Sequence, residues 1–326
     1  MKIKALALIS GGLDSLLAAK LIHDQGIEVI AVHFKIPFCK LDIKENFPAV
    51  GIKIIEVDLG EEFLKLILQP RYGFGTNMNP CIDCKILMFS KAKAMMDELG
   101  AKFIITGEVL GQRPMSQNKQ ALQLIKKQSG LDDLLLRPLS AQFFPPTLAE
   151  KEGWVKREKL LNFNGRRRNP QTQLAKDMGI LKFATPAGGC LLTDADYSRR
   201  LEELLKHKEL NLDNLALLKT GRHFRVGPST RLVVGRNQGE NNLLEQLSKI
   251  DDYLLGPQKN LAGPSALVRG LITTELITLS LKIVGAYTDV LGLNEIEVFY
   301  RKVPQITQTM HKIIHQPKSN FAYLLI

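Results

Sequence analysis

The sequence has no long hydrophobic run. Its longest apolar stretches, such as residues 5–9 and the segment around 281–286, are interrupted within about ten residues, whereas a membrane-spanning helix needs about 20. The first 20 residues also lack the small-residue cleavage pattern of a secretory signal. We therefore expect a cytoplasmic protein without a membrane partner.

Cysteine is scarce. Four cysteines in 326 residues are too few for a disulfide scaffold, so they are buried residues, metal ligands or reactive thiols. Cys39 follows a strand-like run beside a proline and a phenylalanine, and we interpret it as a small hydrophobic residue. Cys81, Cys84 and Cys190 remain as candidates for chemistry.

Acidic residues are outnumbered. The chain has 33 Asp and Glu against 44 Lys and Arg, a net charge of +11 at pH 7, which favours a polyanionic partner. A hydrophobic fraction of 45% excludes a chain that is mainly disordered. The length favours two domains over one.

Short apolar runs alternate with helical patterns in the first half of the chain. Strands are expected at residues 4–9, 29–34, 52–57, 103–106 and 134–137, and helices after residue 15 and at 61–68, 82–99 and 116–128. This alternation predicts an α/β fold with a doubly wound parallel sheet, and we place this domain at residues 1–146.

The pattern changes along the rest of the chain. Residues 147–196 are interpreted as a basic appendage or linker that carries Cys190. Residues 197–326 are predicted to form a second, smaller α+β domain. Its expected helices lie at 196–207, 241–254 and 271–288, and its strands at 222–226, 231–234 and 295–300.

A glycine-rich loop follows the first strand. Residues 10–15 read SGGLDS, which combines small residues, two serine hydroxyls and the start of a helix. Backbone N–H groups at such a helix start attract phosphate. The loop lacks the lysine of a Walker loop, and the alternative is a plain turn capped by Ser10 or Asp14.

The SGGLDS segment resembles the pyrophosphate loop (PP-loop) of the ATP pyrophosphatase superfamily, whose members split ATP between its α- and β-phosphates. The resemblance covers about residues 1–190 and implies an adenine nucleotide α-hydrolase-like fold that binds ATP and Mg²⁺. It implies that these cofactors are held by Ser10, Gly11, Gly12, Asp14 and Ser15. The same resemblance implies that the ATP site also includes His33, Phe34, Thr106, Gly107 and Gln112.

The cysteines suggest which reaction the ATP drives. Cys81 and Cys84 form a CxxC at the start of an expected helix, and Cys190 follows two glycines. Three thiolates suit an iron–sulfur cluster with one iron left open, whereas zinc ordinarily takes a fourth ligand. Persulfide and disulfide chemistry, or a structural metal, are the alternatives.

The surrounding residues resemble two families of tRNA-thiolating enzymes. The segments PCIDCKILM at 80–88 and ITGEVLGQRPMSQ at 105–117 are similar to the pyrophosphatase domain of ThiI, and the Asn79 to Cys84 spacing with the later Gly-Gly-Cys resembles MnmA. By this resemblance Cys84 and Cys190 are the reactive pair. Cys81 departs from the MnmA pattern, which favours the cluster-dependent branch of TtcA-like and TtuA-like enzymes and a [4Fe-4S] cluster on Cys81, Cys84 and Cys190.

Two regions are candidates for RNA contact. Arg166, Arg167 and Arg168 form a basic run that suits phosphates. Segments at 219–225 and 232–241 resemble the RNA-binding NFACT-R domain, a likeness that covers about 197–326 and implies RNA contacts by Arg222, Arg225 and Arg236. The alternative is a domain that serves packing or dimerisation, and with dimerisation the protein would be a homodimer.

Together these features predict an ATP-dependent tRNA sulfurtransferase. It adenylates a base carbonyl, usually of a uridine, and replaces the oxygen with sulfur supplied by a cysteine desulfurase or by sulfide. Asp14, Cys84 and Cys190 are its expected catalytic residues. The alternatives are an ATP-driven amide or C–N ligase with the same loop, and a non-catalytic RNA-binding factor.

Overall fold

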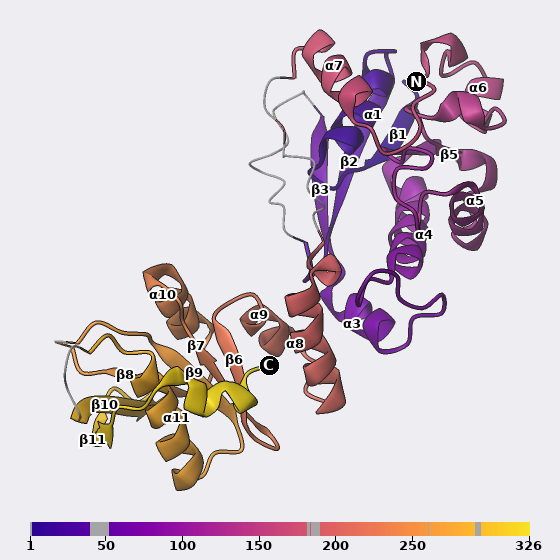
Figure 1. Ribbon diagram of the computed structural model, residues 1–326. Coiled ribbons are helices and arrows are strands. Elements are labelled where there is room, and N and C mark those ends of the chain that lie inside the picture. The colour runs from indigo at the N-terminus through magenta and orange to yellow at the C-terminus, as the bar shows by residue number, and fades with distance from the viewer. Residues whose placement is uncertain (1, 40–51, 181–182, 184–189, 260, 291–294) are drawn as a thin grey trace. The chain divides into compact units, whose positions relative to one another are not determined.

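The chain forms two compact units, Met1–Asp194 and Ala195–Ile326 (Figure 1). The computed structural model describes residues 2–39, 52–180, 183, 190–259, 261–290 and 295–326. The glycines expected before Cys190 lie outside these residues. Within the described ranges, no helix has both the length and the apolar character that crossing a bilayer requires.

The first unit is built on a five-stranded sheet in the order β3-β2-β1-β4-β5, and every pair is parallel. The strands are β1 (Lys4–Leu8), β2 (Glu28–Lys35), β3 (Lys53–Asp58), β4 (Phe103–Thr106) and β5 (Leu135–Leu136). The order reverses between β1 and β4, which is the place where such sheets bind ligands. The predicted α/β class is confirmed.

Helices cover both faces of this sheet because strand residues alternate in direction. Ala5 and Ala7 of β1 pack in one core with α1, whereas Leu6 packs in a second core with α4. The helices are α1 (Leu13–His23), α3 (Gly60–Leu68), α4 (Cys81–Leu99), α5 (Lys119–Gln128), α6 (Leu148–Lys151) and α7 (Asn169–Asp177). Val155 and Ala175 belong to the α1 core, so segments beyond residue 146 help to build this unit.

The second unit contains a six-stranded antiparallel sheet in the order β11-β10-β8-β9-β7-β6. Its strands are β6 (Arg222–Gly227), β7 (Thr230–Val234), β8 (Tyr253–Pro257), β9 (Ala266–Gly270), β10 (Glu295–Lys302) and β11 (Thr309–Ile314). Its helices are α8 (Ala195–Lys206), α9 (Leu212–Leu217), α10 (Gln238–Leu247) and α11 (Thr274–Ala286). Leu232 packs with α11 and Val233 with α10, so helices cover both faces. The predicted α+β class is confirmed.

One helix prediction in this unit is wrong at its C-terminal end. The helix expected at 241–254 ends at Leu247, and Tyr253–Pro257 is strand β8. The Asp252 carboxylate accepts the Lys249 N–H at 2.8 Å and closes a turn between them. Strands β9 and β11 were not expected. In β11 only Ile313 is buried, so the strand carries little alternating pattern.

Candidate active site

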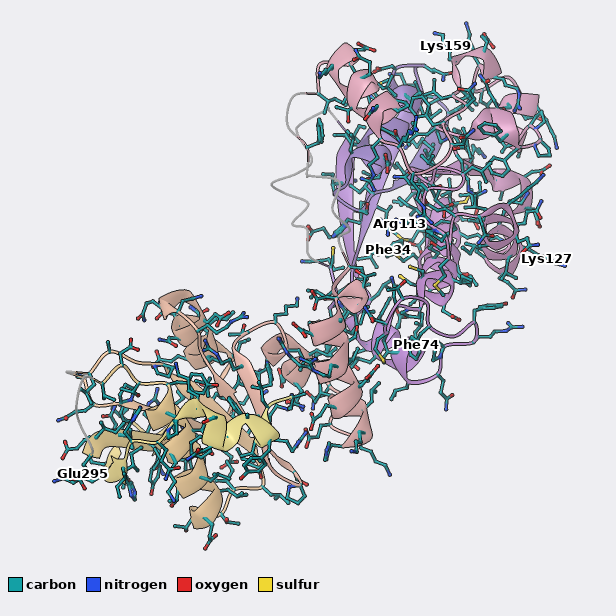
Figure 2. The ribbon with its side chains drawn as sticks, in the orientation of Figure 1. Phe34, Phe74, Arg113, Lys127, Lys159 and Glu295 are labelled. Carbon is teal, nitrogen blue, oxygen red and sulfur yellow. The ribbon has the colours of Figure 1, made fainter. Side chains whose placement is uncertain are left out.

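A pocket of about 260 Å³ opens at the carboxyl ends of β1, β2 and β4. Its walls come from the SGGLDS loop, the end of β2, the first turns of α4 and the loop after β4. Figure 2 labels Phe34 and Arg113, which line this pocket, and Lys127 and Lys159, which lie on the outer surface of the unit. The sheet thus forms its pocket where a doubly wound topology predicts one.

The SGGLDS loop is held in shape by Ser15. The Ser15 hydroxyl donates to the Gly12 carbonyl at 2.8 Å and accepts the Ser10 N–H at 3.3 Å. Gly11 has a φ of +75°, which glycine adopts without strain. Helix α1 then begins at Leu13, so the partial positive charge of its N-terminus lies at the pocket wall.

Asp14 presents an oxygen without a partner. Gln112 Nε2 donates to Asp14 Oδ2 at 2.8 Å, while Oδ1 is buried and has no hydrogen-bond partner among the described residues. Burial raises the pKa of Asp14, although the Gln112 hydrogen bond and the charges of Arg168 and Arg113 oppose the rise. A spare carboxylate oxygen beside a phosphate-type loop suits Mg²⁺, so this donor fits the metal that the resemblance implies.

The loop after β4 lies directly against the SGGLDS loop. A Cβ atom added at Gly107 would come within 2.4 Å of the Asp14 carbonyl carbon and the Ser15 nitrogen. Both of these are backbone atoms, which cannot rotate away. Glycine at position 107 is therefore required for the contact that places Thr106 and Glu108 beside Asp14.

Gly107→Ala is expected to destabilise the first unit by about 1–3 kcal/mol, because the added methyl group forces two backbone segments apart. Thermal unfolding followed by circular dichroism measures the effect. Gly239→Ala in α10 is the control, because its Cβ would meet nothing closer than 3.4 Å. Equal melting temperatures for wild type and Gly107→Ala would contradict the close contact.

A buried network of charged side chains, Glu108 with Lys85 and Arg137, lies at the wall of the pocket. Glu108 accepts hydrogen bonds from Lys85 Nζ at 2.6 Å and from Arg137 Nε at 2.8 Å. Burial alone would raise the pKa of Glu108, but the two cations outweigh it and lower the pKa to about 2. Lys85 also donates to the Ser116 carbonyl at 3.2 Å. The network ties the second turn of α4 to the end of β5 at the edge of the sheet.

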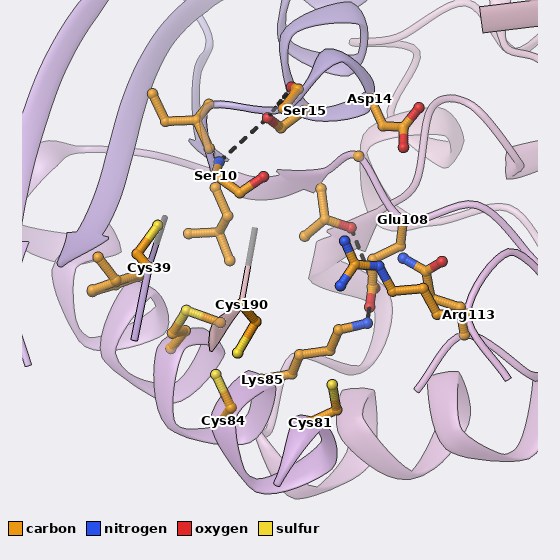
Figure 3. Close-up of a pocket in the computed structure, with 18 of the residues that line it drawn as sticks. Ser10, Asp14, Ser15, Cys39, Cys81, Cys84, Lys85, Glu108, Arg113 and Cys190 are labelled. Atoms are coloured by element: carbon orange, nitrogen blue, oxygen red, sulfur yellow. Dashed lines mark hydrogen bonds and ion pairs between the residues drawn. The ribbon is translucent and has the colours of Figure 1, made fainter. Parts of the chain in front are cut away.

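All four cysteines line this one pocket (Figure 3). Each is a thiol in this structure. Burial raises the pKa of Cys84, and neighbouring Cys81 and Cys190 raise it further. Burial likewise raises the pKa of Cys190 to about 11. The interpretation of Cys39 as a small hydrophobic residue did not anticipate its place at the pocket. The Cys39 side chain is only partly buried there.

Cys81, Cys84 and Cys190 are neighbours in this pocket. Among the described residues, no three His, Cys, Asp or Glu side chains are grouped closely enough to hold a metal ion. Cys81, Cys84 and Cys190 share this pocket, and an iron–sulfur cluster on them stays a prediction. No chemical step below uses such a cluster.

The structure brings most of the predicted ATP-site residues together. The pocket is lined by Ser10, Gly12, Asp14, Ser15, His33, Phe34, Thr106 and Gly107. Gly11 lies within the same loop, and Gln112 contacts Asp14. The His33 ring uses Nδ1 as a donor to the Ile9 carbonyl at 3.1 Å, which leaves the opposite edge of the ring for a ligand. Lys85 and Arg168 also line the pocket and were not predicted to do so.

The predicted RNA-contacting arginines lie in two different settings. Arg168 lines the pocket, and Arg166 and Arg167 are exposed next to it in sequence. In the second unit, Arg225 pairs with Glu209 at 2.8 and 2.9 Å and with Glu203.

Two further arginines of the second unit also have partners. Arg236 pairs with Glu240, and the Arg222 guanidinium lies 4.8 Å from the centre of the Tyr287 ring. An RNA role for these arginines stays a prediction.

Family models match both units. Residues 1–142 match the model described as thiamine biosynthesis protein (ThiI), and residues 221–321 match the NFACT protein RNA binding domain. The chain thus joins a domain similar to ThiI to a domain similar to NFACT-R. Both resemblances predicted from the sequence are thereby confirmed.

Individual proteins match only part of this chain. It is 35% identical over 117 residues to the “Probable tRNA sulfurtransferase” of Methanothermobacter thermautotrophicus, covering 33% of this chain and 30% of that protein. It is 33% identical over 117 residues to the tRNA-specific 2-thiouridylase MnmA of Syntrophotalea carbinolica, covering 31% and 33%. The chain thus spans about a third of the length of these relatives.

Among solved structures, the chain is similar to a 4-thiouridine synthetase in complex with RNA and bound ATP. The match has 21% identity and a TM-score of 0.36, and it covers 66% of this chain and 52% of that one.

Proposed function

We propose that this chain is an ATP-dependent tRNA sulfurtransferase that forms a thiouridine. The observation that carries the proposal is a single pocket in which Asp14 and the SGGLDS loop lie with the thiols of Cys81, Cys84 and Cys190. An ATP-activating loop and a set of cysteines are the two parts that replacement of oxygen by sulfur requires. The relatives named sulfurtransferase and thiouridylase support the same chemistry.

The first step activates the base. A carbonyl oxygen leaves poorly, so it first attacks the α-phosphate of ATP, and pyrophosphate departs as the new P–O bond forms. Loop N–H groups at the start of α1 stabilise the charge that develops on pyrophosphate. Mg²⁺, when bound, would be held by Asp14 and would neutralise phosphate charge. Arg113 and Arg168 add positive charge at the pocket.

The second step delivers sulfur. A cysteine of the site holds the sulfur as a persulfide. A second thiolate breaks its S–S bond, the hydrosulfide that leaves attacks the activated carbon, and AMP departs with the original oxygen. The partial burial of Cys84 and Cys190 limits competition by water, which would restore the oxygen. A cysteine desulfurase supplies sulfane sulfur, which a thiolate of the site takes up as a persulfide. Sulfide, as the alternative donor, would attack the activated carbon directly and would need no cysteine carrier. This version of the proposal uses cysteine-bound sulfur. Delivery by an iron–sulfur cluster on Cys81, Cys84 and Cys190, as the sequence predicts, is the alternative version.

Iron analysis separates these two versions of sulfur delivery. If a cysteine carries the sulfur, protein purified without oxygen contains well under one iron atom per chain and lacks absorption in the visible range. About four iron atoms per chain, with the colour lost in Cys81→Ala, Cys84→Ala and Cys190→Ala, would contradict cysteine-bound sulfur and restore the cluster. Iron content and labile sulfide are measured on the same samples.

The basic run beside the pocket is proposed to guide tRNA to it. Replacing Arg166, Arg167 and Arg168 by alanine should weaken tRNA binding and reduce the slope of log affinity against log salt by about 0.7–0.9 for each lost phosphate contact. Titration of labelled tRNA at several salt concentrations measures both effects. Alanine at Lys65, Lys102 and Lys127, which are exposed elsewhere on the unit, removes the same charge as a control. Equal slopes in the two triple variants would contradict the proposal.

The NFACT-R domain is proposed as the second tRNA contact. Removing residues 195–326 should weaken tRNA binding more than ATP binding, because the SGGLDS loop lies wholly in the first unit. Unchanged tRNA affinity would assign this domain to packing or dimerisation instead.

The proposed function is tested by incubating purified protein with unmodified tRNA, ATP, cysteine and a cysteine desulfurase. Mass spectrometry of the digested tRNA should find a thiolated uridine that requires ATP and is absent with Cys190→Ser. A C–N ligase would turn over ATP without thiolation and would not need Cys190. A non-catalytic RNA-binding factor would bind tRNA and release no pyrophosphate.

A further inference from the structure

Cys39 and Cys190 face each other across an isolated antiparallel β-bridge. The Leu191 N–H donates to the Phe38 carbonyl at 2.9 Å, so the hydrogen bond joins the residue before one cysteine to the residue after the other. Cys39 and Cys190 are therefore a non-hydrogen-bonded pair, whose Cα atoms lie about 4.5 Å apart. That separation is within the range of about 4.4–6.8 Å that disulfides span.

Both segments are anchored near the cysteines. Phe38 is fully buried, and its ring lies 5.4 Å from that of Phe63. On the other side, the Thr193 hydroxyl donates to the Cys190 carbonyl at 2.8 Å, and Asn77 donates to the Thr193 carbonyl at 2.9 Å. The backbone thus holds the two cysteines as neighbours. The Cys190 sulfur points toward Cys84 in Figure 3, so its side chain must rotate for the sulfurs of Cys39 and Cys190 to meet.

The other two cysteines are placed differently. Cys81 and Cys84 lie in the first turn of α4, and the Cys81 thiol donates to Asn79 Oδ1 at 3.0 Å. Figure 3 shows Cys190 between Cys39 and Cys84. Among the described cysteines, Cys39 is the one whose backbone pairs with that of Cys190.

We propose that Cys39 is the thiol that resolves a persulfide carried on Cys190. This inference rests on the proposed sulfurtransferase function. The Cys39 thiolate attacks the Cys190 sulfur, the S–S bond of the persulfide breaks, and hydrosulfide leaves with the electron pair. The outer sulfur is reduced, and the two cysteine sulfurs are oxidised to a Cys39–Cys190 disulfide. The released hydrosulfide attacks the activated base in the same pocket, and a dithiol reductant restores both thiols.

Disulfide mapping tests the pairing without any need for activity. The full chain is treated with glutathione disulfide, alkylated with N-ethylmaleimide and digested with trypsin. Cys39 falls in peptide 36–40, Cys190 in 183–199, and both Cys81 and Cys84 in 72–85. We expect 36–40 linked to 183–199 in wild type and Cys84→Ser, and no such link in Cys39→Ser. A predominant link between 72–85 and 183–199 would overturn the proposal.

Sulfide release tests the chemical step. Protein loaded with inorganic polysulfide should carry a persulfide on Cys190, and wild type should release hydrosulfide before any reductant is added. In Cys39→Ser and Cys39→Ala the release should fall at least tenfold, and mass spectrometry should find the persulfide retained on Cys190. Circular dichroism checks that both variants fold. Release at the wild-type rate in the two folded variants would overturn the role of Cys39.

These outcomes are separable from the proposed function. If the Cys39–Cys190 link forms and hydrosulfide is released, but tRNA gains no sulfur, the resolving role stands and the sulfurtransferase assignment fails. If tRNA is thiolated at the wild-type rate by Cys39→Ser, the assignment stands and the resolving role fails.

Discussion

Asp14→Asn is expected to lower tRNA-dependent pyrophosphate release from ATP by at least about a hundredfold, the size of effect seen when one group that stabilises transition-state charge is removed. The amide keeps the shape of the side chain and its contact with Gln112, but it removes the negative charge at the unpartnered Oδ1 that would hold Mg²⁺. Pyrophosphate release is measured with ATP, Mg²⁺ and tRNA in excess.

The same substitution should not destabilise the fold. Burial raises the pKa of Asp14, so ionisation costs the folded state stability as the pH rises through that pKa. An amide does not ionise, and Asp14→Asn should therefore melt at or above the wild-type temperature at neutral pH. Asp24→Asn, at the exposed end of α1, is the control and should release pyrophosphate normally. Normal release by Asp14→Asn would remove Asp14 from the ATP site.

Glu108→Gln is expected to destabilise the first unit by about 3–5 kcal/mol. The substitution leaves the buried cations Lys85 and Arg137 without their shared carboxylate, and breaking a buried ion pair from one side costs that much. Urea unfolding measures the loss. Glu62→Gln breaks the exposed pair with Lys91 and should cost at most about 1 kcal/mol. Equal stability of the two variants would show that the network contributes nothing.

The pH dependence of stability gives a second measure of this network. The pKa of Glu108 falls from 4.5 to about 2 on folding, because its two cations outweigh its burial. Its contribution is complete above pH 4.5 and is lost as the pH falls toward 2. Wild type should therefore lose more stability than Glu108→Gln over that interval. Parallel stability curves would contradict the lowered pKa.

The parts of the site that the sequence predicts are local. The SGGLDS loop places a strand end, a phosphate-type turn and a helix start within a few residues, so its position in the fold follows directly. The Glu108 network is different, because Lys85 and Arg137 come from elements far apart in the sequence. The sequence signal for this network is a charged residue inside an otherwise apolar segment, as at Lys85, Glu108 and Arg137.

The environment of Cys39 could not be predicted in this way. Its neighbours in the sequence are apolar, which suggests a core residue. Its contact with Cys190 depends on a bridge between segments that are separated by most of the first unit. Likewise, β11 at the sheet edge buries only Ile313, and such a strand gives no periodic signal.

The central claim is that the chain thiolates tRNA by using ATP. Its most direct test is mass spectrometry of the nucleosides in total tRNA from cells lacking this gene, and from the same cells complemented with wild type, Asp14→Asn or Cys190→Ser. The account predicts that one thiolated uridine disappears with the gene, returns with wild type and stays absent with either variant. An unchanged set of thiolated nucleosides in the cells that lack the gene would contradict it.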